Sequence, residues 1–385
     1  MSKISDLIAK LCPNGVEYKK LGDVAEICRG VRVVRKELSE TGKYEVFQNS
    51  LKPLGRYDSF NVKGKTAFVI GAGAAGEIGY SENDFWAADD CYYIDGGEKL
   101  MGRYAYYCLT SRQDWLASKV RKASIPRLAR DFVKALVIPV PPVKIQREVV
   151  EVLDKFALLT AELTAELTAE LEKRKKQYEH YRDKLLKFTQ GGGYKQLTLG
   201  EIGTVAMCKR ILKSQTSNEG EIPFFKIGTF GKVPDAFISK GLYDEYRAKY
   251  SYPRCGDILI SAAGTIGRTV IYNGEPAYYQ DSNIVWLAHD ESVVLNKYLY
   301  YLYQQKPWHV SEGGTIPRLY NENILKTKIV VPPLAEQVRI VKILDRFDKL
   351  CNDLTSGLPA EIAARKRQYE YYRDKLLTFK RKEAA

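Results

Sequence analysis

The segment Ile125–Phe188 recurs as Ile316–Phe379, at a constant offset of 191 residues and without a gap. Its last part reads QYEHYRDKLLKF at Gln177–Phe188 and QYEYYRDKLLTF at Gln368–Phe379. About half of the aligned positions are identical, so this is an internal repeat rather than a shared motif. Two copies on one chain predict a molecule with pseudo-two-fold symmetry. Such a molecule suits a target with two half-sites.

Each copy opens with an apolar run that ends in proline, Ala135–Pro142 and Lys328–Leu334, which predicts a strand. In the first copy apolar residues then recur at helical spacing, and we expect one helix over about 144–188, roughly 65 Å long. The second copy carries Ser356-Gly357-Leu358-Pro359, which predicts that one helix ends there and another begins. A long apolar stripe needs a partner, and we expect the two copies to pair as a coiled coil.

The chain of 385 residues carries a net charge of +13, which predicts a polyanionic partner. The charge is concentrated where the repeats end: Glu172–Phe188 has a net charge of +4 and Ala363–Ala385 of +5. For any single residue, a solvated helix end that favours cations explains the charge as well as a phosphate contact does. The total charge indicates nucleic acid more firmly than any one side chain.

Seven cysteines, at irregular spacing and without a CxxC pair, predict reduced thiols in a cytoplasmic protein rather than a disulfide framework or a zinc site. The three histidines have no metal-ligand spacing. We also expect no signal peptide and no membrane-spanning segment.

Two segments of different character, about residues 13–142 and 191–333, flank the first helical segment. Both are rich in Tyr, Gly, Val and Ile, with short apolar runs split by turn residues, which predicts mixed domains with a substantial β component. They are related only weakly: AAGEIG at Ala74–Gly79 matches AAGTIG at Ala262–Gly267. Copied helices beside diverged domains predict that the helices face the same partner twice and the domains face different targets.

Gly71-Ala72-Gly73-Ala74-Ala75-Gly76 follows an apolar strand and matches the GxGxxG pattern of dinucleotide sites. Glu77-Ile78-Gly79-Tyr80-Ser81 follows instead of a helical stripe, so we expect a tight β-turn whose backbone is able to approach DNA. We find no P-loop, no H-E-x-x-H and no aromatic-flanked N-P-P or D-P-P motif of an aminomethyltransferase. The sequence therefore predicts that this chain alone is not catalytic.

Thr-Ala-Glu-Leu occurs three times after Leu159, and its leucines, at Leu159, Leu163, Leu167 and Leu171, form a good helical stripe. Four residues advance a helix by about 6 Å with a net rotation of about 40°. One base pair advances DNA by about 3.4 Å and about 35°. We therefore interpret these four leucine positions as a candidate spacer ruler, beside their simpler role in helix packing.

Several motifs in this order resemble one known family. They include Pro13-Asn14-Gly15-Val16-Glu17, the Pro-Pro-x-x-x-Gln entries at Pro141–Gln146 and Pro332–Gln337, the Thr-Ala-Glu-Leu units, and Gly357–Ile362. The chain resembles the specificity (S) subunits of type I restriction–modification enzymes over essentially its whole length. The Thr-Ala-Glu-Leu units are similar to those of the subfamily in which their number sets the gap in the recognised sequence.

This resemblance implies an α+β fold in which two mixed α/β target recognition domains are separated by two long antiparallel helices. The expected parts are an N-terminal segment (1–12), a first recognition domain (13–142), a central helical spacer (143–190), a second recognition domain (191–333) and a C-terminal helical spacer (334–385). It further implies a non-catalytic chain without its own cofactor. The implied partners are double-stranded DNA, two methyltransferase (M) subunits that use S-adenosylmethionine to methylate adenine, and restriction (R) subunits that use ATP and Mg for cleavage.

The resemblance does not supply the base-reading residues, so the DNA-binding candidates rest on chemistry: Arg bridges guanine O6 and N7, while Lys mostly meets phosphate. They are Arg29, Arg32, Arg35, Lys36, Lys122 and Arg127 in the first domain and Lys209, Arg210, Lys213, Arg268 and Arg318 in the second. For each of them an ordinary surface cation is the alternative. Weaker polar candidates for base edges are Gln280, Asp281, Ser282 and Asn283.

Four tyrosines of the repeats, Tyr178, Tyr181, Tyr369 and Tyr372, are candidates for helix pairing or for an M-subunit interface. We favour packing between the helices. Two alternative functions stay open at this point. One is a coiled-coil adaptor that binds only protein, and the other is an enzyme that uses the glycine-rich turn.

Overall fold

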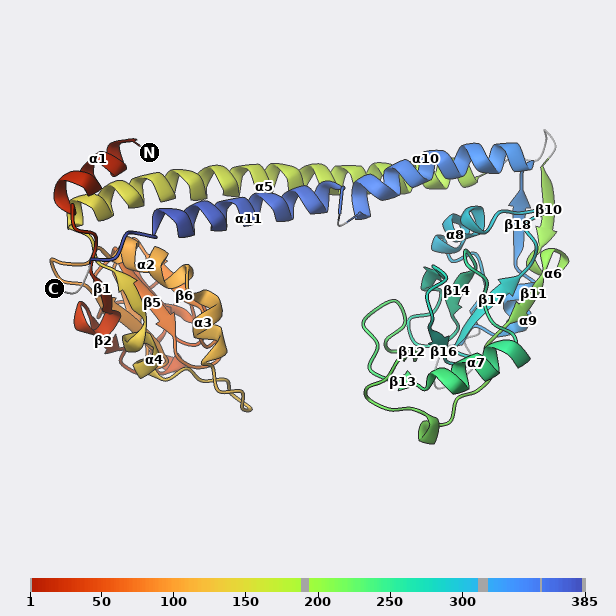
Figure 1. Cartoon of the computed structure of the whole chain (residues 1–385), viewed down its shortest axis with the longest axis horizontal. Coiled ribbons are helices and arrows are strands. Elements are labelled where there is room, and N and C mark those ends of the chain that lie inside the picture. Colours follow the sequence, from red (N-terminus) through yellow and green to blue (C-terminus); the bar gives the residue numbers. More distant parts are fainter. Residues whose placement is uncertain (1, 188–193, 311–317, 354, 383–385) are drawn as a thin grey trace. The chain divides into compact units, whose positions relative to one another are not determined.

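The computed structural model describes residues 2–187, 194–310, 318–353 and 355–382. The chain forms two compact units (Figure 1). Unit 1 contains Met1–Thr168 and Glu361–Ala385, and unit 2 contains Ala169–Ala360. Each unit therefore combines one sheet-rich domain with parts of the long helices.

The helices follow the predicted pattern. Helix α5, Val143–Leu186, has 44 residues, which confirms the expected long helix; Phe188 lies outside the described residues. In the second copy helix α10, Leu334–Asn352, is followed by helix α11, Leu358–Leu376, so the predicted break is confirmed. A Cβ added at Gly357 would lie 2.6 Å from the carbonyl oxygen of Lys349, so the return of the chain at this break requires glycine.

Unit 1 contains three small sheets. The four-stranded antiparallel sheet has the order β2-β8-β5-β6, formed by Glu26–Arg29, Cys91–Asp95, Thr66–Ile70 and Ile78–Ser81. The three-stranded sheet has the order β4-β3-β7, formed by Gly55–Tyr57, Tyr44–Phe47 and Phe85–Ala87, with β7 parallel to β3. Strand β1 pairs with β9, which joins Tyr18–Lys20 to Val137–Pro139 at the two ends of the domain. Its helices are α1 (Ser2–Leu11), α2 (Gly102–Thr110), α3 (Gln113–Ser118) and α4 (Arg130–Ala135), with short 3-10 turns η1 (Leu21–Asp23) and η2 (Arg35–Glu37).

Unit 2 repeats this topology. Its four-stranded sheet has the order β11-β17-β14-β15, formed by Thr204–Ala206, Ile284–Ala288, Ile258–Ser261 and Thr269–Ile271. Its three-stranded sheet has the order β13-β12-β16, formed by Phe237–Ile238, Ile222–Phe225 and Tyr278–Tyr279. Strand β10 pairs with β18, which joins Lys195–Thr198 to Lys328–Val331. Its helices are α6 (Leu199–Ile202), α7 (Lys240–Lys249), α8 (Asn296–Gln304) and α9 (Asn321–Leu325), with a 3-10 turn η3 (Lys213–Gln215). Helix α7 has no counterpart in unit 1 among the described residues, where the chain between β4 and β5 forms no helix.

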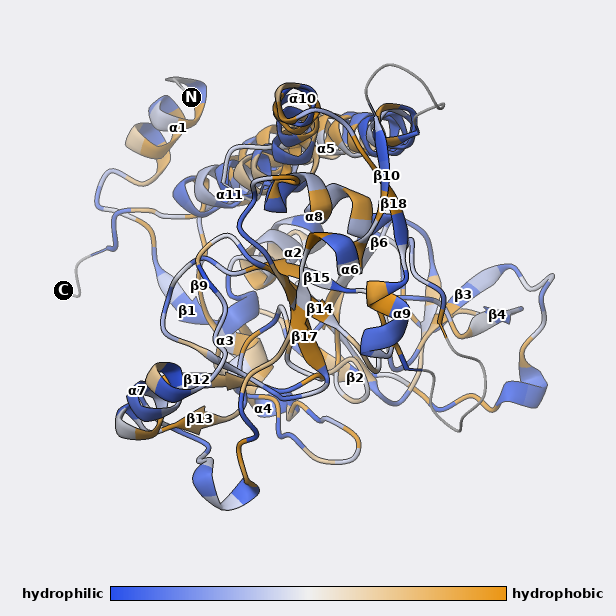
Figure 2. Cartoon of the chain, turned by 90° about the vertical axis from the view of Figure 1, so that its right-hand side faces the viewer, coloured by the Kyte–Doolittle hydropathy of each residue, from blue (hydrophilic) through white to orange (hydrophobic). Residues whose placement is uncertain are grey.

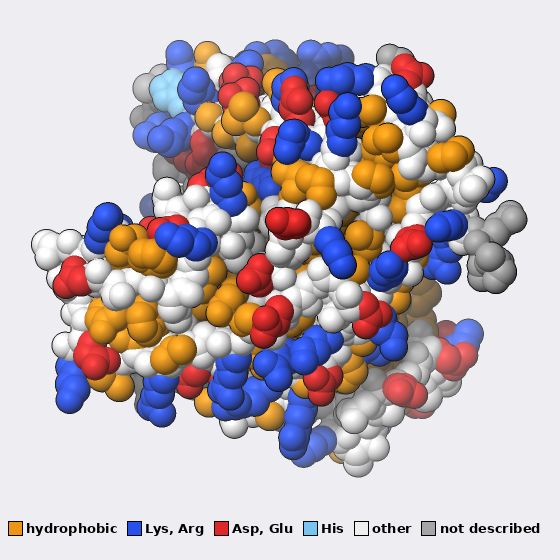
Figure 3. Space-filling model, turned by 90° about the vertical axis from the view of Figure 1, so that its left-hand side faces the viewer, with side chains coloured by type: hydrophobic (Ala, Val, Ile, Leu, Met, Phe, Trp, Pro, Cys, Tyr) orange, Lys and Arg blue, Asp and Glu red, His pale blue; other side chains and the backbone are white. Residues whose placement is uncertain are grey.

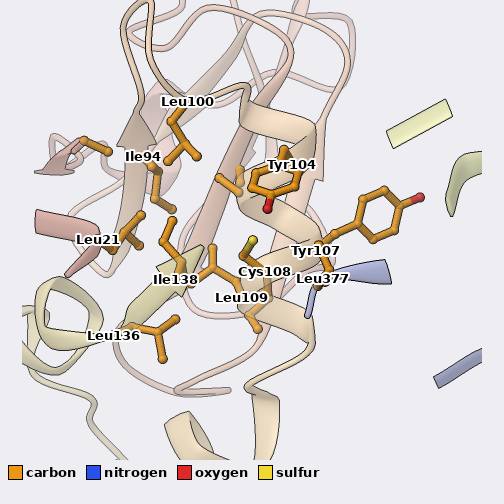
Figure 4. Close-up of a cluster of buried hydrophobic side chains, with 14 of the residues drawn as sticks. Leu21, Ile94, Leu100, Tyr104, Tyr107, Cys108, Leu109, Leu136, Ile138 and Leu377 are labelled. Carbon is orange, nitrogen blue, oxygen red and sulfur yellow. The ribbon is translucent and has the colours of Figure 1, made fainter. Parts of the chain in front are cut away.

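The main core of unit 1 lies between the four-stranded sheet and helix α2 (Figure 4). Ile94 of the sheet and Tyr104 and Cys108 of α2 are fully or almost fully buried there. The first turns of α5 join this core, since Val149 and Leu153 are also buried in it. Each such side chain stabilises the fold by about 1.5–3 kcal/mol, so their burial anchors the start of α5 to the domain.

Unit 2 has the equivalent core. Strands β14 and β17 are strongly hydrophobic (Figure 2), and their side chains pack with Tyr298 of α8 and with Ile340 and Leu344 of α10. Tyr298, Ile340 and Leu344 are fully buried. In both units, therefore, the helix that follows the last strand is built into the domain core.

The long helices pair antiparallel within each unit (Figure 1). In unit 1 the Phe156 ring of α5 lies 6.1 Å from the Tyr372 ring of α11, measured between centroids. In unit 2 the Tyr181 ring of α5 stacks on Phe347 of α10 at 5.8 Å. These contacts are the same repeat positions with the two copies exchanged, which is the pseudo-symmetry that the duplication predicts.

The two chain ends meet in unit 1. The Tyr18 hydroxyl donates to the carbonyl oxygen of Phe379 and accepts from its backbone N–H, both at 3.0 Å. Val16 forms a parallel bridge with Arg381, whose guanidinium lies 4.7 Å from the Tyr18 ring centroid. The C-terminal residues thus anchor α11 to the first domain.

Helix α1 lies in the expected N-terminal segment, residues 1–12, for which no helix is predicted. Ile4 of this helix is buried, and the Lys3 ammonium lies 2.8 Å from the Glu148 carboxylate of α5. The signal was present in the sequence, because Ile4, Leu7, Ile8 and Leu11 have helical spacing.

Candidate nucleic-acid interface

The glycine-rich segment is a hairpin turn. It joins the antiparallel strands β5 and β6, and no helix opens after it. Gly73 and Gly76 have φ values of +84° and +89°, a region that side chains rarely adopt. This confirms the predicted β-turn and excludes the strand–turn–helix arrangement that a dinucleotide site requires.

This turn holds two other loops in place. The Gly71 N–H donates to the carbonyl oxygen of Asp90 at 2.6 Å, and the Gly71 carbonyl accepts from the Leu128 N–H at 2.8 Å. Asp90 precedes strand β8, and Leu128 ends the first Ile-Pro-Arg-Leu segment. The segment that carries Arg127 is therefore tied to the end of the sheet.

Unit 2 repeats these contacts. The Ala262 N–H donates to Asn283 at 2.7 Å, and the Ala262 carbonyl accepts from Leu319 at 2.9 Å. Ile316 and Pro317, at the start of the second Ile-Pro-Arg-Leu segment, lie outside the described residues.

The register of the two turns differs from the sequence match. The match of Ala74–Gly79 with Ala262–Gly267 is wrong by three residues. The Gly76 N–H donates to Ile70 in unit 1 as the Gly267 N–H donates to Ser261 in unit 2, so Gly76 corresponds to Gly267. The sequences match better in the other register, with five identities in six positions against three, so the hydrogen bonds of the turn and not the residue match reveal the equivalent positions.

Four of the first-domain candidates, Arg29, Arg32, Arg35 and Lys36, lie at or just after the end of β2. The Arg29 Nε donates to the carbonyl oxygen of Asp89 at 2.6 Å, which links the last residue of β2 to the turn before β8. The remaining candidates of this domain are exposed: Arg32, Arg35, Lys36, Lys122 and Arg127. Their cationic groups are available to a polyanion, and Arg35 and Lys36 share the 3-10 turn η2.

In unit 2 the structure brings cationic and polar candidates together. The Arg210 Nε lies 2.8 Å from Asp281 Oδ2, and the Arg318 Nη2 donates to the carbonyl oxygen of Ser282 at 2.9 Å. An open cleft of about 500 Å³ is lined by Arg210 and Lys213 together with all four weaker candidates, Gln280, Asp281, Ser282 and Asn283. Its mixture of guanidinium, ammonium, amide and carboxylate groups is the donor and acceptor set that base edges and phosphates require.

Two second-domain candidates are engaged elsewhere. The Arg268 Nη1 donates to the carbonyl oxygen of Phe230 at 2.9 Å, and its side chain is half-buried. The Lys209 ammonium lies 5.0 Å from the centroid of the Tyr250 ring. The first contact is structural, whereas the second leaves the ammonium at the surface.

The cationic loops of the two units are equivalent. Turn η2 in unit 1 and turn η3 in unit 2 are closed by the same contact: Glu37 accepts from the Val34 N–H at 2.9 Å, and Gln215 accepts from the Leu212 N–H at 2.8 Å. Two residues before each of these N–H groups stands an arginine, Arg32 or Arg210. Sequence reasoning named both arginines without finding that they occupy the same place in the two domains.

Figure 3 shows one face of unit 1, with Lys and Arg side chains along the lower edge as well as over the helices at the top. Within the described ranges no group of His, Cys, Asp and Glu is arranged to hold a metal ion. None of the described helices is long and apolar enough to cross a bilayer.

The ruler leucines and the repeat tyrosines lie on the paired helices. Leu159 and Leu163 line an apolar groove of about 210 Å³ with Tyr369 and Tyr372. Leu167 is half-buried, and Leu171 packs against the core of unit 2.

Tyr178 is buried, and its hydroxyl donates to Gln304 Oε1 at 2.8 Å. Tyr181 and Tyr372 are partly exposed, each in contact with an aromatic ring of the facing helix.

Comparison with known proteins gives consistent matches over nearly the whole chain. The model of the type I restriction modification DNA specificity domain matches residues 13–173 and 192–364. A Haemophilus influenzae chain assigned as a type I restriction enzyme specificity subunit is 47% identical over 376 residues, 94% of this chain and 96% of that one. The specificity subunit of the Escherichia coli type I restriction enzyme EcoR124I/EcoR124II is 33% identical over 309 residues, 74% of this chain and 72% of that one.

Solved structures show the same fold. A chain from a study of complex assembly and conformational transition of the type I restriction–modification system has a TM-score of 0.66 at 18% identity, covering 96% of this chain and 98% of that one. The HsdS subunit from Thermoanaerobacter tengcongensis has a TM-score of 0.50 at 18% identity, covering 95% and 97%. With two specificity-domain matches, each on one sheet-rich domain and its helix, the chain belongs to the family of type I restriction–modification DNA specificity subunits.

Proposed function

We propose that this chain reads a bipartite, asymmetric DNA sequence, with one half recognised by each sheet-rich domain. The observation that supports this most is the pair of equivalent cationic loops on one shared topology. Arg32 and Arg210 occupy matching places, while the residues around them differ, as Arg35-Lys36-Glu37 does from Lys213-Ser214-Gln215. A shared frame with different side chains reads two different sequences in the same way.

The paired helices would hold the domains apart and dock the partner subunits. Both copies carry the Gln-Tyr-Glu-x-Tyr-Arg-Asp-Lys-Leu-Leu segment almost unchanged, which suits two copies of one partner, the M subunit. R subunits would complete the complex. In this proposal S-adenosylmethionine belongs to the M subunits and ATP and Mg to the R subunits, and this chain supplies sequence recognition alone.

The direct test measures DNA binding by the complex with M subunits, using duplexes that carry the methylated motif of cells expressing it. We expect the logarithm of the binding constant to fall linearly with the logarithm of salt concentration, because phosphate contacts release counterions. Arg32→Ala and Arg210→Ala should each weaken binding by about five- to one-hundred-fold, equivalent to about 1–3 kcal/mol per contact. Lys249→Ala on helix α7 is the matched control, since its ammonium pairs with Glu245 at 2.9 Å.

Each arginine variant should relax the sequence preference in one half of the motif only. Binding that is insensitive to salt and to both arginines would contradict the proposal and favour an adaptor that binds only protein. The purified chain without partners should show no methyltransferase, ATPase or nuclease activity, and turnover by it would contradict the assignment of chemistry to the partners.

A further inference from the structure

A buried glutamine joins the first domain to its helix. Gln146, in the first turn of α5, is fully buried. Its Oε1 accepts from the Met101 N–H at 3.0 Å, and its Nε2 donates to the carbonyl oxygens of Lys99 and Pro141, both at 2.8 Å. One side chain thus fixes the start of α5, the end of the preceding strand region and the start of α2.

A second polar contact lies eight residues further along α5. Asp154 Oδ1 accepts from the Tyr107 hydroxyl at 2.5 Å and from the Arg103 Nε at 2.7 Å, both on α2. Tyr107 is almost fully buried, and its ring points away from that of Tyr104 (Figure 4). The Arg103 guanidinium also lies 4.6 Å from the Tyr80 ring centroid. Burial and then the hydrogen bond to Asp154 raise the pKa of Tyr107, so its hydroxyl stays protonated and able to donate.

Unit 2 has the same glutamine contact. Gln337 is fully buried at the start of α10, and its Oε1 accepts from the Leu295 N–H at 2.9 Å. Its Nε2 donates to the carbonyl oxygens of Val293 and Pro332, at 2.9 and 2.8 Å.

The second contact of unit 2 differs from that of unit 1 in one group only. Asp345 of α10 accepts from the Tyr301 hydroxyl of α8 and lies 3.2 Å from the Lys297 ammonium. Lysine therefore takes the place of Arg103, while the carboxylate and the phenol are unchanged.

The two units thus share these contacts between domain and helix, which form a joint. We define the unit 1 joint as Gln146, Asp154, Arg103 and Tyr107, and the unit 2 joint as Gln337, Asp345, Lys297 and Tyr301. In each joint the two polar contacts are about 12 Å apart along the helix, at about 1.5 Å per residue. One contact alone would act as a pivot, whereas two of them fix both position and tilt.

Small tilts matter at the scale of DNA. A domain of about 130 residues has a radius of gyration of about 14 Å and is therefore about 35 Å across. A tilt of about 6° moves a point at that distance by about 3.4 Å, the rise of one base pair per strand. An angular error of this size at either joint would let the domain reach a half-site one base pair out of place.

We propose that the two joints set the tilt of each domain on its helix, and that Asp154 and Asp345 are thereby positioning residues for the length of the unread gap. This inference rests on the proposed function. The joint residues touch no base; they act by holding each reading surface at one angle.

The first experiment measures the tilt without DNA, on the full chain with its M subunits. Nitroxide labels are placed through unnatural amino acids at Lys63 and Glu162, which are exposed and both in unit 1. We expect a narrow distance distribution in the parent and a clearly broader one in Asp154→Ala. Glu166→Ala, on the same helix, is the matched control and should leave the distribution unchanged. Tyr107→Phe removes only a hydroxyl and should broaden the distance distribution less. It keeps the test decisive if Asp154→Ala does not fold.

The second experiment measures gap selection. Duplexes carry both half-sequences of the parental motif with the parental gap or a gap one base pair shorter or longer. We expect Asp154→Ala and Asp345→Ala each to reduce the preference for the parental gap by about tenfold, while affinity for a duplex with a single half-site changes by less than about twofold. Arg103→Lys copies the cation of unit 2 and should keep the parental preference.

The outcomes separate the inference from the function on which it rests. An unchanged distance distribution in Asp154→Ala, or a broader one with an unchanged gap preference, would overturn the inference. So would equal losses on single half-sites and on full sites, because these would indicate a damaged reading surface. A parent complex that does not distinguish bipartite sites at all would overturn the proposed function, and the label distances would then show by themselves whether the joint fixes the tilt.

Discussion

Gln146 and Gln337 stand 191 residues apart and make the same three hydrogen bonds, each to one backbone N–H and two backbone carbonyls. Both side chains are fully buried. The Pro-Pro-x-x-x-Gln entries of the sequence are therefore the mark of a structural joint, with the prolines ending a strand and the glutamine closing the first helical turn over it.

Replacement of either glutamine should destabilise its unit. Gln146→Leu keeps an apolar body of similar size but leaves one N–H and two carbonyls without partners in a buried site. We expect the free energy of unfolding to fall by about 2–4 kcal/mol, since each buried unsatisfied group costs about 1–3 kcal/mol and nearby groups relax. Urea unfolding followed by circular dichroism measures this. Gln368→Leu, at an exposed position of α11, is the control, and an equal loss in both variants would contradict the role of the joint.

Deletion of Thr164–Leu167 should shorten the unread gap by one base pair and leave both half-sequences intact. The deletion removes about 6 Å and a net rotation of about 40°, close to one base-pair step in rotation. It should fold, because Ala, Glu and Leu are good helix formers and the deletion restores the leucine stripe. Thr168 would take over the hydrogen bond that the Thr164 hydroxyl donates to the Thr160 carbonyl at 2.8 Å. Methylated motifs mapped in otherwise identical cells give the parental gap, expected at about 6–8 base pairs, and that of the deletant. An active deletant with the parental gap would show that the repeat is a helix without a measuring role.

Exchange of residues 191–333 for the matching segment of a relative should change one half of the target only. The exchange points lie just before β10 and just after β18, which pair with each other, so the segment begins and ends at one place. The half read by the first domain should stay unchanged, because its loops, its joint and its core lie in unit 1. Motif mapping again gives the result, and a simultaneous change of both halves would contradict the division of reading between the domains.

Thiol reactivity should follow burial. Cys255 is exposed and should react first with a disulfide reagent, whereas Cys108 and Cys208 are buried. Burial raises the pKa of both of these thiols to about 12. The Cys255→Ser variant should lose the fast phase and keep the slow one. If the fast phase survives this substitution, Cys255 is not the fast-reacting thiol.

The same thiols give a pH dependence. The unfolded chain ionises them near pH 8.5, and the folded chain only near pH 12, so the folded state binds more protons in between. Their contribution to stability is complete below about pH 8.5 and is lost as the pH rises towards 12. The urea midpoint of unfolding, measured from pH 7 to pH 11, should therefore fall at the alkaline end. The midpoint of the Cys208→Ala variant should fall less steeply with pH.

The sequence by itself determined the duplication, the long first helix, the break in the second and the β content of both domains. These follow from local rules: apolar residues at helical spacing, Gly357 followed by Pro359, and short apolar runs between turn residues. It also determined what the glycine-rich segment is not, because no helical stripe follows Gly76. The resemblance to the specificity subunits implied the arrangement of two recognition domains and two long helices.

Only the tertiary structure decided which residues act together. It placed Arg32 and Arg210 at equivalent points, shifted the match of the two glycine turns by three residues, and joined Asp154 to Tyr107 across 47 residues of chain. Such contacts depend on how strands and helices pack in three dimensions, and the spacing of residues along the chain carries no record of them. The joint is identified by hydrogen bonds that Gln146 makes in unit 1 and Gln337 repeats in unit 2, although most other residues of the two domains differ.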